Sequence, residues 1–581
     1  MSFKSGFRKT LCSLIVVGLL LSLALACAAP AGEKATVAPT TKAAPTEAAA
    51  KPAEATSTPK PVEKPVSAPA AGEPKRGGIL RSALKTSPPI WGPDKSMSGP
   101  CHYPLSLIYS KLTSTRMASD VDPGDQSPIG DLAESWEIPN DRTYIFHLNK
   151  GVKWQNKEPV NGRELVAEDI KFTIEHIRAS KAGLAPMYEL ATKIECPDKY
   201  TVKITLNEPF APFLTYCGGN FFHVVAREVE EKYGDYDKWN TTVGTGPFML
   251  TEYVPDSKLT YVRNPDYYKK GLPYLDGITV LIVADGSTRL AALRSGQLHQ
   301  PLIDTVNVER TDIPMLKKTN PELVYFDYIR AGQPLIFYRT DLKPFNDVRV
   351  RRAVSLALDR KKWLDSMFLG VGVDQSGPCT AAYTDWWLPT DKLGDAAQWL
   401  KYDPELAKKL LAEAGYPNGF DTILATTTGY GVSHVEQAEL INDFLNKVGI
   451  RTKMKLIEYA AYQSTYSLGK YEEGLYFGLS SAHPEVDGFF YNEFKPGQVK
   501  NWSYVKDPKV DEMVEKQRRA VDVKERKKII DELTKYVWDQ MYYVYTPFGA
   551  EACVWSPKLK NFRPKADYNL GRRYEVVWFE Q

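Results

Sequence analysis

A long segment without large apolar side chains divides the chain into two unlike parts. From Ala28 to Arg76 the sequence contains no Leu, Ile, Phe, Tyr or Trp and consists mainly of Ala, Pro, Thr, Lys and Glu. Such a composition cannot bury enough apolar surface to offset the entropy lost when a chain becomes ordered. We therefore expect a disordered tether over residues 27–75 and a folded body that begins at residue 76.

The residues before the tether have the pattern of an export signal. Three basic residues among the first nine precede an apolar run from Leu11 to Ala26, which is too short for a membrane-spanning helix of about 20 residues. The sequence Ala24-Leu25-Ala26-Cys27 resembles a bacterial lipobox, in which the cysteine thiol is lipidated. We predict a signal peptide over residues 1–26 and a lipid anchor on Cys27. This anchor would hold the body outside the cytoplasm, in the periplasm or at the cell surface. The alternative is plain secretion.

The charge balance is close to even. The 581 residues include 74 Lys and Arg against 71 Asp and Glu. Removal of the signal would take away three basic and no acidic residues, which leaves 71 of each. A neutral body gives no electrostatic reason to expect a nucleic acid as partner.

The body alternates strand and helix signals. Residues 144–148 and 200–206 alternate apolar and polar side chains, which is typical of half-buried strands. Apolar residues at helical spacing predict helices over 404–414 and 522–541, each with an Asp at its start. A helical stripe that ends at Gly449 is followed at once by strand alternation. Strands joined by helices of this length predict α/β lobes.

Catalytic and metal-binding motifs are missing from the sequence. It contains no H-E-x-x-H pair, no G-x-S-x-G elbow, no Walker lysine loop and no G-x-G-x-x-G. The cysteines of the body are odd in number and widely spaced, which fits neither a zinc site nor a disulfide framework; they are Cys101, Cys196, Cys217, Cys379 and Cys553. We expect no enzyme activity, no cofactor and no metal, and we leave any disulfide pairing open.

Several blocks of sequence resemble one protein family in the family's order. They are Asp131-Leu132-Ala133-Glu134-Ser135-Trp136, residues 144–154 and 167–173, Gly244-Thr245-Gly246-Pro247-Phe248, residues 263–268 and 289–296, and residues 344–353. Together they closely resemble the extracellular solute-binding proteins of family 5, the oligopeptide, dipeptide and related binding proteins of ABC importers. The resemblance covers essentially the whole body.

The resemblance implies an α/β fold of the periplasmic-binding-protein type II, in its large three-domain form with two lobes and a hinge. Domain I would comprise residues 76–112, 241–328 and 548–581, domain II residues 113–240, and domain III, the second lobe, residues 329–547. The chain would cross the hinge near Tyr328 and Pro547. Closure would bury a ligand between the lobes and present it to a permease with its ATPase. A monomer is expected.

Physical reasoning assigns most of these blocks to structure. Two glycines and a proline in residues 244–247 suit a tight backbone passage. Asn346 or Asp347 would cap a helix over the following residues, which include Arg349, Arg351 and Arg352. The three arginines are interpreted as a solvated helix face in preference to an anion site. Trp136 and Trp154 are assigned to core packing.

The ligand anchor expected from the resemblance is absent at its usual place. In the peptide-binding members an Asp in a stretch similar to residues 476–485 pairs with the ammonium group of the peptide. The matching position here is Ala482, and the aromatic residue usual nearby is Leu479. A charge buried on closure needs a partner. Glu485 or Asp487 could take over that role.

The other candidates come from regions that resemble ligand-facing segments of the family. The full set of candidate ligand-binding residues is Phe337, Tyr338, Tyr383, Trp386, Trp387, Gly478, Leu479, Ser480, Ser481, His483, Glu485, Asp487, Trp502 and Tyr504. Core packing is an equal alternative for each Trp pair, and His483 alone is more often structural. We predict a binding protein for a peptide-like or other polar organic solute. An oligosaccharide binder on the same scaffold and a ligand sensor without transport are the alternatives.

Overall fold

Three sheets of four or five strands carry most of the fold. The computed structural model describes residues 73–95, 99–180, 185–303, 307–472, 474–480, 483, 485–566 and 573–580. All of these residues belong to the unit Thr58–Gln581. The predicted signal peptide, Cys27 and nearly all of the predicted tether lie outside the described residues, as do Ser481 and Ala482. The predictions made for them therefore stay predictions.

The first sheet has the strand order β1-β10-β9-β8. β1 runs parallel to β10, and β9 is antiparallel to both of its neighbours. Strand β20, from the last part of the chain, forms a separate three-stranded sheet with β11 and β12. The elements here are β1 (Ile79–Leu84), α1 (Gly99–Ser106), β8 (Phe248–Val254), β9 (Lys258–Arg263), β10 (Gly277–Ile282), α6 (Gly286–Arg294), β11 (Asn307–Val308), η2 (Arg310–Asp312), α7 (Ile313–Thr319), β12 (Val324–Tyr328), β20 (Glu551–Trp555), β21 (Leu559–Lys560) and β22 (Trp578–Phe579).

The second sheet is an antiparallel sheet of order β4-β5-β7-β6. Tyr144, Phe146 and Leu148 of β5 are buried and alternate with less buried residues, which confirms the predicted strand pattern. The elements here are β2 (Thr113–Thr115), β3 (Pro128–Gly130), β4 (Ala133–Asn140), β5 (Thr143–Leu148), α2 (Ala167–Ser180), α3 (Ala185–Tyr188), β6 (Ala191–Asp198), β7 (Thr201–Leu206), α4 (Phe213–Tyr216), α5 (Arg227–Tyr233) and η1 (Trp239–Thr241).

The third sheet is mixed, with the order β16-β15-β17-β13-β18. β15 runs parallel to β16 and β17, whereas β13 is antiparallel to β17 and β18. Every residue of β13, which lies between β17 and β18, is buried. The strands here are β13 (Gln333–Tyr338), β14 (Gly372–Val373), β15 (Phe420–Thr427), β16 (Ile450–Ile457), β17 (Leu475–Ser480), β18 (Val544–Tyr545) and β19 (Phe548–Gly549).

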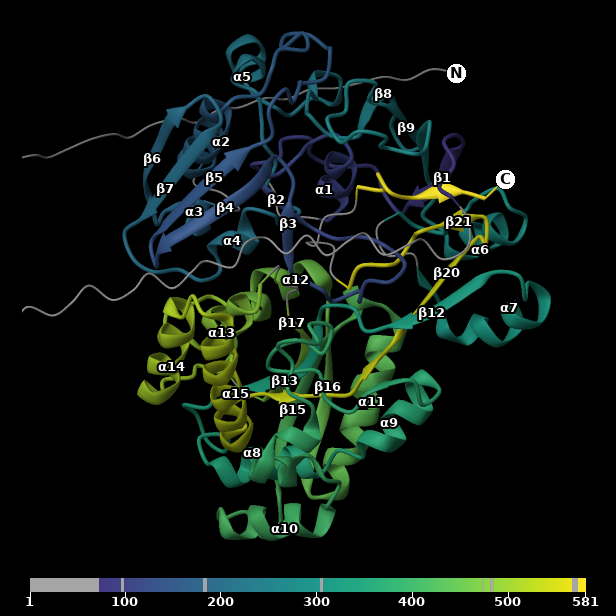
Figure 1. Ribbon diagram of the computed structural model, residues 1–581. Coiled ribbons are helices and arrows are strands. Elements are labelled where there is room, and N and C mark those ends of the chain that lie inside the picture. The colour runs from purple at the N-terminus through teal and green to yellow at the C-terminus, as the bar shows by residue number, and fades with distance from the viewer. Residues whose placement is uncertain are drawn as a thin grey trace, which may run out of the picture. The chain divides into compact units, whose positions relative to one another are not determined.

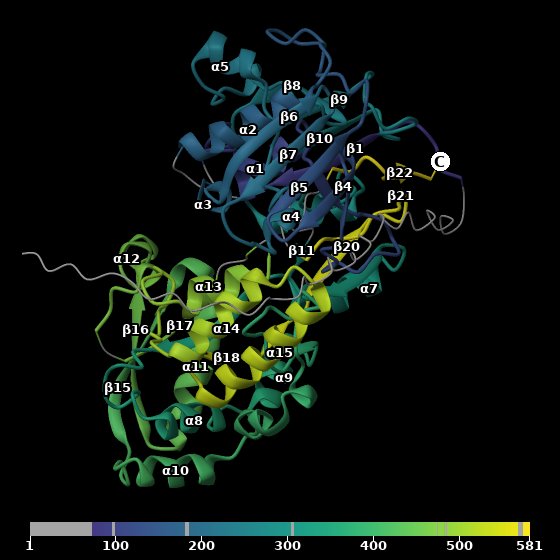
Figure 2. The same ribbon diagram turned by 60° about the vertical axis from the view of Figure 1, so that its left-hand side comes forward.

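Helices cover both faces of this third sheet (Figures 1 and 2). They are α8 (Val348–Leu356), α9 (Arg360–Phe368), η3 (Thr390–Lys392), η4 (Gly394–Leu400), α10 (Pro404–Glu413), η5 (Thr428–Tyr430), α11 (Val432–Lys447), α12 (Tyr459–Ser464), η6 (Tyr466–Leu468), α13 (Asp487–Phe494), α14 (Pro508–Arg519) and α15 (Val523–Gln540). We call residues 76–328 and 548–580 lobe 1 and residues 329–547 lobe 2, after the predicted bounds.

The chain passes between the lobes at two adjacent places. β12 ends at Tyr328 and β13 begins at Gln333, while β18 ends at Tyr545 and β19 begins at Phe548. The two passages are hydrogen-bonded, because Thr546 donates its backbone N–H and its hydroxyl to the carbonyl oxygen of Pro334, both at 3.0 Å. The predicted crossings near Tyr328 and Pro547 thus lie side by side, and the domain bounds themselves stay a prediction.

Local capping signals produce the predicted helix starts. The Asp403 carboxylate accepts the backbone N–H of Leu406 at 2.9 Å, and the Asp522 carboxylate accepts that of Glu525 at 2.8 Å. These bonds satisfy donors that the first turn of a helix leaves without a partner. The helices predicted over 404–414 and 522–541 are confirmed as α10 and α15.

Glycines 244 and 246 allow two stretches of backbone to approach closely. A Cβ atom at Gly244 or Gly246 would collide with the carbonyl oxygen of Ile108. The N–H of Gly246 donates to that same oxygen at 2.7 Å. The predicted tight passage is therefore confirmed, and its reason is contact with the residues that follow α1.

The arginines of α8 do not form the solvated face that the sequence predicted. Arg351 is buried and donates to the carbonyl of Gln540 at 2.9 Å, and Arg352 donates to the carbonyl of Asp539 at 3.1 Å. These carbonyls stand at the end of α15, where a helix has no internal donors left. The prediction was wrong for both residues, because a run of charged residues in the sequence does not reveal which distant groups will bind them in the fold. Arg349 pairs with the capping residue Asp347 at 2.6 Å.

Candidate functional site

The predicted ligand segment, sequence positions 478–487, is called the candidate segment below. It begins near the end of β17 and ends at the first residue of α13. Gly478 is buried, Leu479 is half-buried and Ser480 is buried. Ser480 donates its hydroxyl to the carboxylate of Glu493, which also accepts the hydroxyl of Tyr545 at 3.0 Å. Burial raises the pKa of Glu493 to about 7. The end of β17 therefore rests on a buried acid that sequence reasoning missed.

Glu485 forms a buried ion pair inside lobe 2. Its two carboxylate oxygens accept from the guanidinium of Arg526 at 2.6 and 3.0 Å, and one of them also accepts the backbone N–H of Asp487 at 2.5 Å. Only 2% of Glu485 and 5% of Arg526 is exposed. A bidentate pair of this kind leaves the carboxylate little capacity for another cation.

Asp487 is likewise engaged within the lobe. It accepts a hydrogen bond from the side-chain amide of Gln517 at 2.5 Å and lies 3.4 Å from the guanidinium of Arg518. Burial raises the pKa of Asp487 to about 6, the nearby Glu485 adds to the rise, and Arg518 opposes it. Both acids that could replace the missing anchor thus have arginine partners of their own.

Lobe 1 meets this network through the residues around α4. Burial raises the pKa of Tyr216 well above its ordinary value, and the carboxylates of Asp487 and Glu485 contribute to the rise. The backbone N–H of Ala211 donates to the carbonyl oxygen of Arg518 at 2.8 Å. The candidate segment therefore lies beside a contact between the two lobes.

His483 and Tyr383 hold each other in lobe 2. The Tyr383 hydroxyl donates to the backbone carbonyl of His483 at 2.6 Å, and the rings of both residues stand edge-on to Phe489. Burial lowers the pKa of His483 well below its ordinary value, so the ring is neutral at pH 7. Its Nε2 atom has no hydrogen-bond partner within the described residues.

Two pairs of predicted ligand-facing aromatics belong to the core or to its edge. Phe337 stacks on Trp502 with ring centres 5.2 Å apart, and both are buried. Tyr338 is buried and donates its hydroxyl to the carbonyl of Met541 at 2.7 Å. Tyr504 packs against the guanidinium of Arg339 at 3.6 Å. Phe337 also packs on Tyr476 of the neighbouring strand β17, with ring centres 4.7 Å apart.

The Trp386-Trp387 pair is half-buried and lies near the candidate segment. The ring of Trp386 packs against Arg526, whose guanidinium lies 5.2 Å from the ring centre. Trp387 donates its indole N–H to the side chain of Gln375 at 3.4 Å. Trp386 therefore packs against the arginine of the Glu485–Arg526 ion pair.

Arg526 and Gln517 are residues of this site that the sequence analysis missed. The sequence did contain a signal for them, because each of the two polar residues occupies a position in a helix stripe that is otherwise apolar. Gln517 continues the stripe of Val510 and Val514, and Arg526 stands three residues before Ile529. A polar residue at such a position must find a partner inside the protein.

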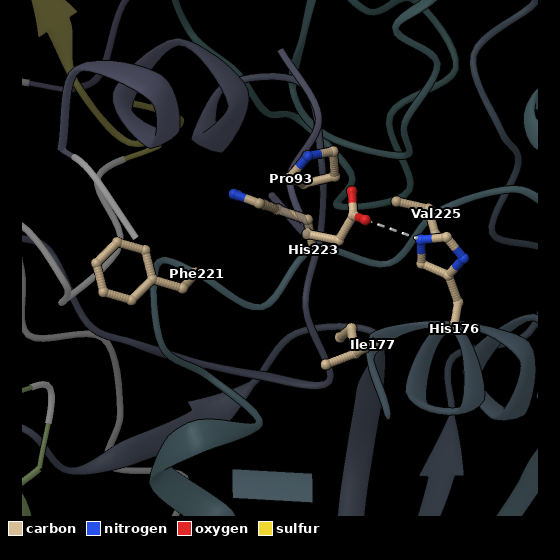
Figure 3. A pocket seen from close by; sticks show the side chains of 7 residues that line it. Pro93, His176, Ile177, Phe221, His223 and Val225 are labelled. Atoms are coloured by element: carbon tan, nitrogen blue, oxygen red, sulfur yellow. Dashed lines mark ion pairs between the residues drawn. The ribbon is translucent and has the colours of Figure 1, made fainter. Parts of the chain in front are cut away.

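A small cavity lies elsewhere in lobe 1 (Figure 3). It has a volume of about 10 Å³ and is lined by Pro93, Asp94, His176, Ile177, Phe221, His223 and Val225. His176 lies 3.4 Å from Asp94 and 3.3 Å from Glu230. The nearby carboxylate of Asp94 is the main reason that the pKa of His176 is raised. A cavity of this size holds one water molecule at most, so it is not a site for an organic solute.

The described ranges contain neither a metal cluster nor a membrane-spanning helix. No group of three or more His, Cys, Asp or Glu residues there is arranged to hold a metal ion. None of the helices in those ranges is long and apolar enough to cross a membrane. No disulfide joins the five cysteines that the structure describes.

Comparisons with known proteins agree with the resemblance. The profile of the bacterial extracellular solute-binding proteins, family 5, matches residues 127–501. Heme-binding protein A of Haemophilus influenzae is 29% identical over 481 residues, which are 78% of this chain and 84% of that protein.

Solved structures extend the agreement to the fold. The ABC transporter-associated periplasmic binding protein DppA of Helicobacter pylori, in complex with the peptide STSA, is 26% identical with a TM-score of 0.69 over 87% of this chain and 99% of that chain. AgaA of A. tumefaciens, in complex with agropinic acid, is 26% identical with a TM-score of 0.68 over the same shares. The predicted two-lobe α/β fold is confirmed.

These relatives are named as binding proteins or were solved with a bound solute. The profile covers more than half of the chain and includes the candidate segment. This chain therefore belongs to the bacterial extracellular solute-binding proteins of family 5.

Proposed function

We propose that the protein captures a peptide-like or other polar organic solute between its lobes and delivers it to the permease of an ABC importer. The observation that carries the proposal is the placement of Gly478–Ser480, Glu485 and Asp487. This segment lies beside the contact between Ala211 of lobe 1 and Arg518 of lobe 2. A solute bound there would touch both lobes, as a closing protein requires.

We propose further that the ligand needs no free ammonium group to be held by this segment. Position 482 is an alanine, and the carboxylates of Glu485 and Asp487 already face Arg526 and Arg518. Taking either carboxylate for a ligand would leave a buried guanidinium without its partner, which costs several kcal/mol. The substitute-anchor role of Glu485 or Asp487 stays a prediction that these ion pairs argue against.

The ligands of the relatives support a wide choice of solute. Their names and complexes include heme, a peptide and agropinic acid, and heme carries no ammonium group. Of the two alternatives, an oligosaccharide would need exposed flat aromatics. Trp386 and Trp387 are half-buried and already contact Arg526 and Gln375, so the peptide-like or organic solute is preferred. A sensor without transport would bind the same solutes.

A thermal-shift screen tests the proposal. The panel holds a dipeptide, its N-acetyl derivative, glutathione, hemin and maltotriose, because a ligand that binds only the folded state raises the unfolding midpoint. We expect at least one of the first four to raise it, and the N-acetyl derivative to bind within about threefold of its parent dipeptide. A shift with maltotriose alone would favour the oligosaccharide alternative. A loss of a hundredfold or more on acetylation would refute binding without an ammonium anchor.

We propose that the protein is exported and held at the membrane by a lipid on Cys27. The supporting pattern is the basic start, the short apolar run and the small residues before the cysteine. Cys27→Ala should release the body from membranes while it still binds its ligand. Membrane attachment that persists in this variant would contradict lipidation. The proposal includes a monomer and no catalytic turnover, and hydrolysis of any panel compound would contradict the latter.

A further inference from the structure

Beside the candidate segment, one short loop of lobe 1 makes three interactions with lobe 2. Ala211 donates its backbone N–H to the Arg518 carbonyl at 2.8 Å. The guanidinium of Arg519 pairs with the carboxylate of Glu208 at 3.3 Å. The guanidinium of Arg518 lies 5.1 Å from the ring centre of Phe210. Loop 207–212 of lobe 1 thus contacts the last two residues of α14 in lobe 2.

This contact stands apart from the places where the chain passes between the lobes. Figure 1 shows α4, which follows the loop, at the left above α13 and α14, whereas β12 and β20 lie at the right. A rotation about the passages at the right would separate the loop from α14. An open hollow of about 510 Å³ lies beside the contact, lined by Asp141 of lobe 1 and by residues of α14 and α15 including Arg519 and Glu525. The lobes therefore do not pack flush here.

The strength of the contact suits repeated opening. The side chains of Arg519 and Glu208 are 55% and 47% exposed. An ion pair that is exposed to water in this way is weak and is screened by salt. Such contacts change an equilibrium between two forms by a few-fold each, which is enough to bias a balanced equilibrium.

The lobe 2 side of the contact is fixed by the candidate segment. Arg518 lies 3.4 Å from the carboxylate of Asp487 and 3.7 Å from the ring centre of Tyr491, both residues of α13. Asp487 also accepts from Gln517, one residue before Arg518. Movement of the start of α13 would therefore move the end of α14.

We propose that loop 207–212 and Arg518-Arg519 form a latch that holds the two lobes together, and that Asp487 positions Arg518 for it. The inference rests on the proposed function, because a latch matters only where lobes open and close around a solute. It assigns to Asp487 a role between the lobes in place of contact with the ligand.

Charge exchange across the latch is the test. The variants are Glu208→Arg, Arg519→Glu and the double exchange of both, and the matched control is the exchange of Asp421 and Arg451, an exposed ion pair at 2.7 Å within lobe 2. Amide hydrogen exchange of residues 207–213 reports breakage of the Ala211 bond. Single-molecule energy transfer between dyes at Lys193→Cys of lobe 1 and Lys409→Cys of lobe 2, in a Cys196→Ser background, reports the ratio of closed to open molecules without any ligand.

Each single reversal should speed exchange of residues 207–213 and lower the closed-to-open ratio by about three- to tenfold. The double exchange should restore both to within twofold, and the control exchange should change neither. Asp487→Asn should lower the ratio as the single reversals do, while Asn retains the hydrogen bond to Gln517 and the variant stays folded. Raising NaCl from 50 to 500 mM should lower the ratio in the original protein and not in Arg519→Ala.

Unchanged ratios and exchange rates in the single reversals, or no recovery in the double exchange, would overturn the latch. A fall in thermal stability with an unchanged ratio in Asp487→Asn would overturn its positioning role. These failures are distinct from failure of the proposed function. In that case the latch variants respond as expected while none of the panel compounds binds. If panel compounds bind and the variants do not respond, only the latch is wrong.

Discussion

A buried lysine in lobe 1 adds more positive charge than its surroundings require. The carboxylate of Asp131 pairs with Arg573 and lies 3.1 Å from the ammonium of Lys269, which also pairs with Glu575 at 2.8 Å. Two cations thus balance two carboxylates. Lys111 is fully buried beside them, yet within the described part of the chain its ammonium makes no ion pair and contacts only the side chain of Asn220, at 3.5 Å.

We predict that Lys111→Met stabilises the protein at neutral pH. Burial, with the charge of Arg573, lowers the pKa of Lys111 from 10.5 to about 7. At about 1.4 kcal/mol for each pH unit, keeping this ammonium charged in the folded state costs on the order of 5 kcal/mol. The variant loses a hydrogen bond to Asn220, which offsets about 1 kcal/mol. Met has a similar volume, so we expect a net gain of about 2–4 kcal/mol in the free energy of unfolding.

The pH dependence distinguishes this reason from better packing. Above pH 7 the folded protein gives up the proton of Lys111, while the unfolded chain keeps it up to pH 10.5. The burial cost is therefore complete below pH 7 and falls as the pH rises from 7 toward 10.5. The advantage of Lys111→Met should be constant below pH 7 and shrink by up to about 1.4 kcal/mol for each pH unit above it.

Urea unfolding between pH 6 and 9, followed by circular dichroism and tryptophan fluorescence, measures this difference. Lys269→Met is the matched control, because Lys269 pairs with both carboxylates. Its loss should destabilise the protein by about 2 kcal/mol or more, since a buried carboxylate is left without its cation. A folded Lys111→Met that is less stable than the original at pH 6, or a gain that does not change with pH, would refute the charge argument.

Three further changes test single features of the fold. Gly244→Ala should destabilise the protein by about 2 kcal/mol or more, because its Cβ would collide with the Ile108 carbonyl; an unfolding midpoint equal to the original would contradict this. Asp403→Ala should cost about 1 kcal/mol through loss of the cap on Leu406, and Asp403→Asn, which keeps an acceptor, should recover most of it. His176→Gln should remove a pH dependence. Because the pKa of His176 is raised beside Asp94, the charged ring stabilises the folded protein fully below pH 6.5, and this stabilisation is lost as the pH rises through the raised pKa. If the unfolding curves of the variant changed with pH as those of the original do, this role of His176 would be excluded.

Local structure could be predicted from the sequence because its causes are local. Asp403 and Leu406 stand three residues apart, and the alternation of Tyr144, Phe146 and Leu148 lies within one strand. The tight passage at Gly244 also followed from composition alone. Its partner, the carbonyl of Ile108, did not, because it lies 136 positions earlier in the chain.

The charged clusters could not be predicted for the same reason. Asp131 belongs to one of the blocks that carry the family resemblance, but its partner Arg573 is 442 residues away. Arg351 and Arg352 looked solvated because the carbonyls that they bind belong to α15. In each case the sequence showed a charge, and only the fold showed the group that compensates it.

Glu485 and Asp487 are likewise acids whose compensating groups only the fold shows. An acid near a ligand is useful as an anchor only if it lacks a partner in the ligand-free protein, because a bound cation must repay the desolvation of the pair. Arg526 and Gln517 lie on the buried stripes of α15 and α14, so they bring their polar groups to these two acids. The helix periodicity of α14 and α15 therefore places the polar partners of both acids within lobe 2. Arg518, which lies beside Asp487, also contacts loop 207–212 of lobe 1. We therefore propose that a solute that binds here is recognised by other groups.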